Sequence, residues 1–321
     1  MQVLTELDRA QIAELLARDE FFWLDLRSPS PDEIQQLGDM LDLHRLAREA
    51  LAEFDQRPRL DRYENYVVLV FYGVGGEGRD PLEPIEGHLL VSGSYVVTVH
   101  REAYAELERL RDHFSRRAVE GSEEFIVYKI LDALADSFFP ALAAVDEEID
   151  TLEDAIVSHA DEEQLQRIFQ LKRALVGLRR IATPQRDLLA RTIDEIAELP
   201  GFEADTRDYF RDVYDHMIRV SDLIDSYRDL LTGALDVYLS TVSNRLNSVM
   251  ERLTIVATIF LPLSVLTGFF GMNFGWLVRH INSFAAFMIW GVGGVVVCVG
   301  LLLVLFWRAG YLGTRPPAAK I

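Results

Sequence analysis

The last 70 residues of this 321-residue chain contain no acidic side chain. All 51 aspartates and glutamates lie at or before Glu251, whereas the remainder carries five cations and long uncharged runs. The first 251 residues hold 27 basic and 51 acidic side chains, which gives a formal charge of −24. Such a surface repels nucleic acid and anionic lipid and attracts cations, although a general contribution to solubility explains the same composition.

Other chemical features are scarce. Cys298 is the only cysteine, so no internal disulfide forms, and no Cys/His cluster with zinc spacing is present. The chain does not begin with a basic segment followed by an apolar one, so we expect no signal peptide. The sequence also lacks a nucleophile–base pair, a phosphate loop and a metal-ligand triad. We therefore expect neither an enzyme nor a nucleic-acid-binding protein.

Two segments are apolar enough to cross a bilayer, which takes roughly 20 helical residues. The first runs from about Val249 to Phe270 and the second from Phe284 to Trp307. The link between them, Gly271–Ser283, is too short to fold by itself, so the two form a helical hairpin. The tail after Trp307 carries three cations and no anion, which favours the cytoplasm. We expect a multi-pass protein of the cell's inner (plasma) membrane with both termini cytoplasmic.

The two spans differ in character. The second is aliphatic apart from a glycine break at Gly291–Gly294, as expected of a peripheral helix. The first contains small and hydroxylated residues, which suit close packing or a polar lumen. These residues are Thr254, Thr258, Pro262, Ser264, Thr267 and Gly268. Two spans cannot enclose a path, so a pore requires several copies of the chain.

The N-terminal part predicts a mixed α/β fold followed by helices alone. Apolar, β-branched runs predict strands at 21–27, 65–74 and, as a hairpin around Ser94, 87–101. Helical patterns follow at 122–158, at 161–198 and from about 205 into the first span, roughly 65 residues or ~100 Å. We expect the following parts: a cytoplasmic α/β domain at 1–121, antiparallel helices at 122–203, a stalk helix continuing as the first span at 204–270, an external loop at 271–283, the second span at 284–307 and a basic cytoplasmic tail at 308–321.

Aspartate recurs every seven residues along the predicted stalk helix. The five residues are Asp208, Asp215, Asp222, Asp229 and Asp236, which share one slowly drifting stripe. One interpretation is a solvated face paired with Arg207, Arg211, Arg219 and Arg228. The other is an electronegative lining that concentrates cations at the inner mouth of a pore.

The run Leu230–Phe274 ends in Gly271-Met272-Asn273 and contains Tyr238, Asn247 and an IFLPLS segment in order. It closely resembles the CorA family of divalent-cation transporters, and the resemblance extends over almost the whole chain. It implies a funnel-shaped homopentamer whose stalk helices line the pore, with the second spans outside. It implies a selectivity filter at Gly271, Met272 and Asn273. The implied pore-lining and gate residues are Asn247, Met250, Leu253, Ala257, Leu261, Ser264 and Gly268.

The chemistry of Mg²⁺ agrees with an amide at the filter. Mg²⁺ releases its waters reluctantly, and neutral oxygens from several subunits can hydrogen-bond its hydration shell without retaining the ion. Gly271 is expected to let the backbone turn there. The structural alternative for Asn273 is a helix C-cap, and for Met250, Leu253 and Leu261 it is ordinary helix packing rather than hydrophobic gating.

Two departures from the family pattern concern regulation and the ion. The family's regulatory Mg²⁺ site between subunits would use Asp212 on the stalk and an acidic residue of the helix HRLAREALAE. Glu49 is retained there but Ala50 replaces the usual aspartate, so the site is either rebuilt from Glu49 or Glu53, or weakened. The link FGWLVRHINS also lacks the acidic residues of many magnesium transporters.

Three functions follow from these observations. We expect transport of hydrated Mg²⁺, with Co²⁺ and Ni²⁺ as further cargo, by a homo-oligomer that contacts lipid and needs no cofactor beyond the divalent cation. A Zn²⁺ transporter of the same superfamily, coupled to protons, is the alternative. A cytoplasmic sensor on a two-helix anchor is a third interpretation, but it does not account for the polar first span.

Overall fold

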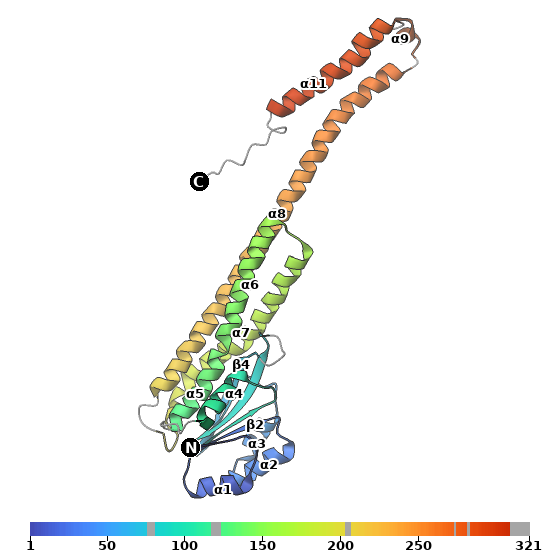
Figure 1. Ribbon diagram of the computed structural model, residues 1–321. Helices are drawn as coiled ribbons and strands as arrows, with labels where there is room; N and C mark the ends of the chain where they lie inside the picture. Colours follow the sequence, from blue (N-terminus) through green and yellow to red (C-terminus); the bar gives the residue numbers. More distant parts are fainter. Residues whose placement is uncertain (76–80, 117–122, 203–206, 273, 281–282, 309–321) are drawn as a thin grey trace. The chain divides into compact units, whose positions relative to one another are not determined.

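The computed structural model describes residues 1–75, 81–116, 123–202, 207–272, 274–280 and 283–308 (Figure 1). The chain divides into two units, Met1–Leu239 and Ser240–Ile321, which are described separately. The N-terminal unit is a mixed sheet with helices on both faces. The C-terminal unit contains two stretches of helix long and apolar enough to cross a membrane.

A six-stranded sheet forms the centre of the N-terminal unit, in the order β1-β2-β6-β5-β4-β3. β1 and β6 pair with β2 in parallel. In the rest of the sheet each strand is antiparallel to its neighbour: β6 to β5, β5 to β4 and β4 to β3. The strands are β1 (Gln2–Leu4), β2 (Phe22–Arg27), β3 (Arg59–Arg62), β4 (Tyr66–Val74), β5 (Pro84–Ser92) and β6 (Tyr95–His100). The predicted strands and the hairpin at Ser94 are confirmed, while the short β1 and β3 were not expected.

Alternation along each strand divides the core between the two faces of the sheet. Phe22 and Leu24 pack into one core with α1 (Arg9–Ala17), α2 (Pro31–Met40) and α3 (Arg45–Ala52). Trp23 points to the other face, where it joins the larger core made by the later helices. Both faces of β2, β4 and β6 are therefore buried, which explains their nearly continuous apolar runs.

The later helices of this unit include α4 (Ala105–Arg116), which was not predicted, and a pair that was predicted as one helix. The structure has α5 (Glu123–Asp136) and α6 (Phe138–Ser158), separated at Ser137. The Ser137 hydroxyl donates to Leu134 O at 2.6 Å and accepts from Val74 N at 2.9 Å. Pro140 follows three residues later and has no N–H to continue the helical ladder. These two residues account for the interruption.

Helix α7 (Glu162–Ala197) begins at an Asp161–Gln164 capping box and lies antiparallel to α8 (Arg207–Gly271). One hydrogen bond and two ion pairs join the two helices, and residues later in α7 contact residues earlier in α8. The pairs are Lys172 with Thr232 at 2.8 Å, Arg179 with Asp225 at 3.0 Å and Asp194 with Arg207 at 3.0 Å. The 65-residue length of α8 agrees with the prediction. Its buried apolar residues alternate three and four apart: Phe210, Val213, Met217, Val220, Ile224, Tyr227, Leu231 and Ala234. This is the spacing of a helix with one apolar seam.

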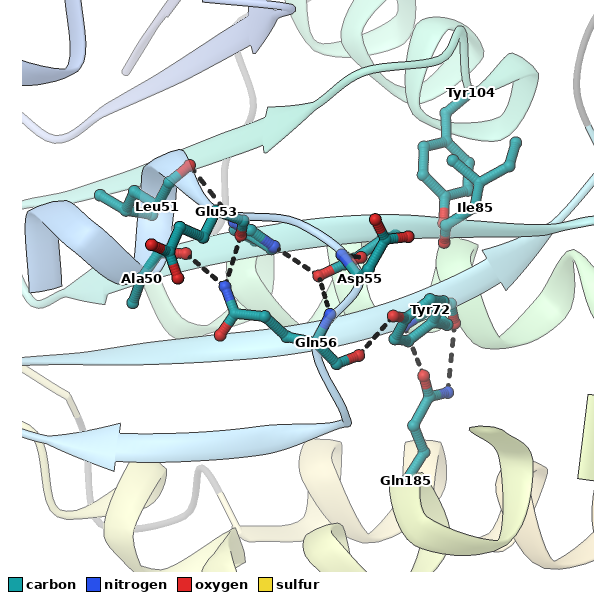
Figure 2. A network of polar contacts seen from close by, with 11 residues as sticks. Ala50, Leu51, Glu53, Asp55, Gln56, Tyr72, Ile85, Tyr104 and Gln185 are labelled. Carbon is teal, nitrogen blue, oxygen red and sulfur yellow. Dashed lines mark hydrogen bonds and ion pairs between the residues drawn. The ribbon is translucent and has the colours of Figure 1, made fainter. Parts of the chain in front are cut away.

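Side chains complete the edge of β4 beyond the end of β3, which stops at the Arg59–Val70 pair. The buried amide of Gln185 on α7 accepts from Tyr72 N and donates to Tyr72 O, the latter at 3.1 Å (Figure 2). The same amide lies 3.9 Å from the sulfur of Met217 on α8. The strand is thereby tied to both long helices through one side chain.

The C-terminal unit starts within α8 and continues through α9 (Gly275–His280), α10 (Phe284–Ala286), a π-helical turn η1 (Phe287–Val292) and α11 (Gly293–Arg308). The link that was predicted as a loop therefore contains the short helix α9. The predicted glycine break is a π-helical turn that ends at Val292, and regular α-helix resumes at Gly293. A π-turn changes the direction of side chains without interrupting the helix.

Candidate functional site

The hydroxyl groups of the first span are satisfied within the helix. Thr254 donates to Met250 O at 2.8 Å, Thr258 to Thr254 O at 2.7 Å and Ser264 to Phe260 O at 2.9 Å. Such bonds to the carbonyl four residues earlier allow hydroxyls to lie in an apolar environment without a partner helix. Each oxygen still has acceptor capacity, so the span is polar enough to contact water or an ion.

All seven predicted pore residues lie on α8 and are exposed in the single chain. The three predicted gates are well exposed, Met250 at 55%, Leu253 at 62% and Leu261 at 71%. On an ideal helix of 3.6 residues per turn the seven positions fall within an arc of about 120°. The set is Asn247, Met250, Leu253, Ala257, Leu261, Ser264 and Gly268, all exposed. They form one unpartnered face of the span, which is required of a pore lining but does not by itself establish one.

The predicted filter lies at the end of α8. Gly271 is its last residue, and Met272 N donates to Phe269 O at 3.3 Å. Gly271 is helical and does not have a positive φ, and the chain leaves the helix directly after it. That Gly271 allows the backbone to turn there stays a prediction. A Cβ at Gly271 would meet nothing within 4 Å in the single chain. Asn273 lies outside the described residues.

The aspartate stripe is solvent-exposed at all five positions, Asp208, Asp215, Asp222, Asp229 and Asp236. Within the described residues none of these carboxylates forms an ion pair. Three of the four arginines offered as partners have other contacts: Arg207 pairs with Asp194 and Arg228 with Asp225, and Arg219 lies over the Phe139 ring. Among the described residues, Arg211 forms no ion pair with the stripe. The stripe is therefore an uncompensated negative face of α8 rather than a set of paired charges.

Two helices bring a second group of carboxylates together around one histidine. Asp132 and Asp136 are one turn apart on α5, and Asp212 and His216 are one turn apart on α8. His216 Nδ1 lies 3.2 Å from an oxygen of each α5 aspartate, and its Nε2 lies 3.9 Å from Asp212. We call Asp132, Asp136, Asp212 and His216 the α5–α8 carboxylate cluster.

The donors of this cluster are arranged as metal ligands are. One ligand atom each from Asp132, Asp212 and His216 lie within 4.8 Å of one another. Asp132 is 8% exposed, and Lys129 Nζ lies 3.0 Å from its other oxygen. The two carboxylates suit a hard dication such as Mg²⁺, and the imidazole adds a nitrogen donor that suits Co²⁺ or Zn²⁺.

The electrostatics of the cluster also favour a bound cation. Partial burial, together with the negative charge of Asp132, raises the pKa of Asp136 above its ordinary value even though His216 acts in the opposite direction. Tyr128 donates to Asp212 at 2.7 Å, and burial with that hydrogen bond raises the pKa of the Tyr128 hydroxyl. The three carboxylates face one ammonium group, that of Lys129, so negative charge is in excess.

The predicted partner of Asp212 lies elsewhere in the chain. Glu49, on α3, lines a surface depression of about 550 Å³ together with Glu53 and Arg59. Among the described residues of one chain, the donors around Asp212 are Asp132 and His216 and do not include Glu49. A bridge between Glu49 of one copy and Asp212 of another stays a prediction.

Sequence reasoning singled out Asp212 but missed its neighbours. The spacing of Asp132 and Asp136, and of Asp212 and His216, is i, i+4 in each case, which places each pair on one helical face. That signal was available, but nothing in the sequence specifies that those two faces meet. Their contact depends on how α5 packs against α8 in the larger core.

The sequence matches the family described as CorA-like Mg²⁺ transporter protein over residues 18–308. It is 34% identical over 278 residues to the cobalt/magnesium transport protein CorA of Thermotoga maritima, covering 85% of this chain and 77% of that protein. It is 25% identical over 292 residues to the zinc transport protein ZntB of Yersinia enterocolitica, covering 90% of this chain and 86% of that protein.

The fold also matches a solved structure, the CorA magnesium transporter from Methanocaldococcus jannaschii. The TM-score is 0.78 at 24% identity, and the match covers 90% of this chain and 91% of that one. The match includes the α/β unit, the long helix and the apolar C-terminal helices, so the predicted fold class is confirmed. On the extent of the family match and the identity to the Thermotoga protein, this chain belongs to the CorA family of membrane metal-ion transporters.

Proposed function

We propose that this chain assembles as a homopentamer that conducts hydrated Mg²⁺, with Co²⁺ and Ni²⁺ as further cargo, into the cytoplasm. The observation that carries the proposal is the exposed face of α8 between Asn247 and Gly268, which leads directly to Gly271-Met272-Asn273. One copy cannot enclose a path, and five copies of this face would surround one. The magnesium and cobalt transport ascribed to the Thermotoga relative supports the choice of ion.

Asn273 performs the selection in this proposal. Five amide oxygens at the outer mouth accept hydrogen bonds from the waters of a hydrated dication, which Mg²⁺ retains because its dehydration is costly. Neutral oxygens hold the ion weakly enough for it to leave toward the pore. Met250, Leu253 and Leu261 would then form narrow apolar rings that exclude water when the pore is closed.

The aspartate stripe would supply cation attraction on the inner side. Seven residues fall about 20° short of two full turns on an ideal helix, so the stripe drifts toward the face that carries Asn247. Five exposed carboxylates per copy, multiplied by five copies, produce a strongly negative surface. Dications that leave the pore would be held near this surface before they diffuse away.

The α5–α8 carboxylate cluster would report the internal cation concentration. Asp212 is the stalk residue of the proposed regulatory site, and Asp132 and His216 complete a set of donors within one chain. A dication bound there would neutralise the charge that raises the pKa of Asp136. Binding would also brace α5 against α8, the helix that continues as the first span. Glu49 of a neighbouring copy is a further proposed donor.

The proposed orientation places both termini in the cytoplasm. The two spanning helices have 0% of their most apolar windows buried within the chain, as expected of surfaces that meet lipid or other copies. The basic residues that follow the second span favour the cytoplasmic side, and an even number of spans returns the N-terminal unit to the same side.

Substitution of Asn273 by alanine in the full-length chain tests the proposal. Purified protein is reconstituted in liposomes loaded with a Mg²⁺-sensitive dye, and uptake is started by external Mg²⁺. We expect the variant to lose at least about tenfold in rate, since the filter no longer offers oxygens to the hydrated ion. Asn282→Ala, in the same link, is the matched control and should transport normally. Unchanged uptake and ion preference in Asn273→Ala would refute the filter.

Zinc transport coupled to protons is the second candidate. It is supported by the similarity to the zinc transport protein ZntB, by the imidazole in the α5–α8 carboxylate cluster and by the absence of carboxylates from the external link. The same liposomes with a Zn²⁺-sensitive dye separate the two candidates. Faster Zn²⁺ than Mg²⁺ uptake that depends on a pH gradient would favour the zinc transporter.

A further inference from the structure

The short helix α9 places a cation close to the predicted filter. Arg279 is the fifth of its six residues and is exposed. No acidic side chain occurs after Glu251, so the link contains none, and in the part of the chain that the structure describes Arg279 forms no ion pair. Among the described residues, no acidic side chain therefore compensates the charge of this guanidinium.

The distance from Arg279 to the filter is short on an electrostatic scale. Arg279 is seven residues after Met272, the last described residue of the predicted filter. Three residues of extended chain span at most about 11 Å and the four steps from Gly275 to Arg279 in α9 add about 6 Å, so the separation is at most about 17 Å. The Debye length is about 30 Å at 0.01 M ionic strength, so at low salt a dication at the filter experiences this charge. A homopentamer would present five such charges around one opening, and their potentials add.

We infer that Arg279 is an electrostatic entry barrier that sets the external concentration at which the transporter saturates with dications. This inference rests on the proposed function, because it assumes that the link surrounds the external mouth. Positive charge at that mouth lowers the local concentration of Mg²⁺ without touching the ion. The barrier acts on loading of the filter and leaves the passage of a bound ion through the apolar rings unchanged.

Salt dependence distinguishes a charge effect from a structural effect. Added monovalent salt screens the repulsion, so it should speed uptake by the wild-type protein at low external Mg²⁺. A negative side chain at the same position should attract the dication, and added salt should then slow uptake. A side chain that only supports the fold of the link would not reverse the sign of this dependence.

The test uses full-length protein in liposomes of neutral lipid, so that headgroup charge does not dominate the surface potential. The external Mg²⁺ concentration at half-maximal uptake is measured for wild type, Arg279→Lys, Arg279→Gln and Arg279→Glu. Arg308→Gln is the matched control, because it removes the same charge at the opposite end of the second span. Each variant is assayed at low and high concentrations of choline chloride.

We expect Arg279→Gln to lower the half-maximal concentration about threefold and Arg279→Glu about tenfold, at the low end of the range over which surface potentials change association. Maximal rates should stay unchanged, and Arg279→Lys and Arg308→Gln should behave like wild type. Equal half-maximal concentrations and equal salt dependence in wild type, Arg279→Gln and Arg279→Glu would overturn the inference. Absence of uptake by every protein, wild type included, would instead refute the proposed function.

Discussion

In the N-terminal unit, side chains as large as Trp23 and Phe210 are fully buried, whereas in the C-terminal unit Gly291 is the only buried residue among those that the structure describes. Both units are rich in apolar residues, so composition does not explain the difference. The N-terminal unit buries its apolar surface within one chain. The C-terminal unit has to bury it against lipid and other copies, and its single-chain form is incomplete.

The same helix belongs to both units, which allows the comparison to be tested with one residue type. Phe210 is fully buried and Phe260 is 64% exposed, and both lie on α8. Phe210→Ala should lower the free energy of unfolding by about 3–5 kcal/mol because it leaves a cavity in the core. Phe260→Ala should change it by less than about 0.5 kcal/mol. Chemical unfolding of detergent-solubilised protein measures both, and equal losses would contradict the distinction.

A buried polar network provides the next largest effect. Asp25 accepts from Thr98 at 2.6 Å, and His100 Nε2 and an Arg111 nitrogen each lie 3.0 Å from its carboxylate. Burial opposes ionisation of Asp25, but the bonds from His100 and Thr98 and the charge of Arg111 outweigh it, so the pKa falls below 3.8. Asp25→Asn should cost about 3 kcal/mol at neutral pH because it removes the charged partner of the Arg111 guanidinium and of the His100 ring in a buried site.

The pH dependence of this variant has a definite sign. Because the folded-state pKa of Asp25 is lowered, its contribution to stability is present above pH 3.8 and is lost as the pH falls through the folded value. Wild type should therefore lose stability on acidification below about pH 4. Asp25→Asn should show a shallower loss over that range. Thermal melts of both proteins at a series of pH values measure this loss. If wild type and Asp25→Asn lost stability equally steeply below pH 4, the network would not contribute.

Loss of the Gln185 amide, which completes the edge of β4, should lower the free energy of unfolding by less than loss of the Asp25 carboxylate. Gln185→Leu preserves volume but leaves Tyr72 N–H and C=O without partners in a buried site. Its expected cost is about 2 kcal/mol, the penalty for unsatisfied buried polar groups. Gln170→Leu on the exposed face of the same helix should stay within about 0.5 kcal/mol. Faster hydrogen exchange at Tyr72 in the first variant alone would confirm the local cause.

Cation binding gives the smallest of these effects. A dication at the α5–α8 carboxylate cluster should stabilise the folded protein by about 1.4 kcal/mol at ten times its dissociation constant. Because the pKa of Asp136 is raised, its protonated form stabilises the cation-free fold at low pH, and this contribution is lost as pH rises. Stabilisation by Mg²⁺ should therefore grow with pH. Asp132→Asn should abolish the melting shift, while Asp222→Asn on the exposed stripe should retain it.

The sequence predicted those parts of the fold that depend on local pattern. Apolar β-branched runs predicted β4 and β6, and charge-free runs marked both spans. It did not predict the separation of α5 from α6, because the hydroxyl of Ser137 bonds to a strand 63 residues earlier. Short elements such as β1 and β3 have too few residues to show a period.

The candidate site was predictable to a similar degree. Residues on one helix, such as the aspartate stripe and the pore face, follow from spacing alone. Donors on different helices, such as Asp132 and His216, come together through tertiary packing that no local pattern encodes. The free charge of Arg279 was visible in the sequence, but its position on a helix was not.

The Gln185 amide that hydrogen-bonds the edge of β4 at Tyr72 has a consequence for contacts between copies of the chain. Strand edges recruit strands from other chains, and a protein whose copies gather at one place in a membrane presents many such edges to its neighbours. Where β3 ends, an incoming strand would first have to expel a fully buried amide from Tyr72. Beyond the end of β3, the strand β4 therefore does not offer Tyr72 as a free edge to a strand of another copy.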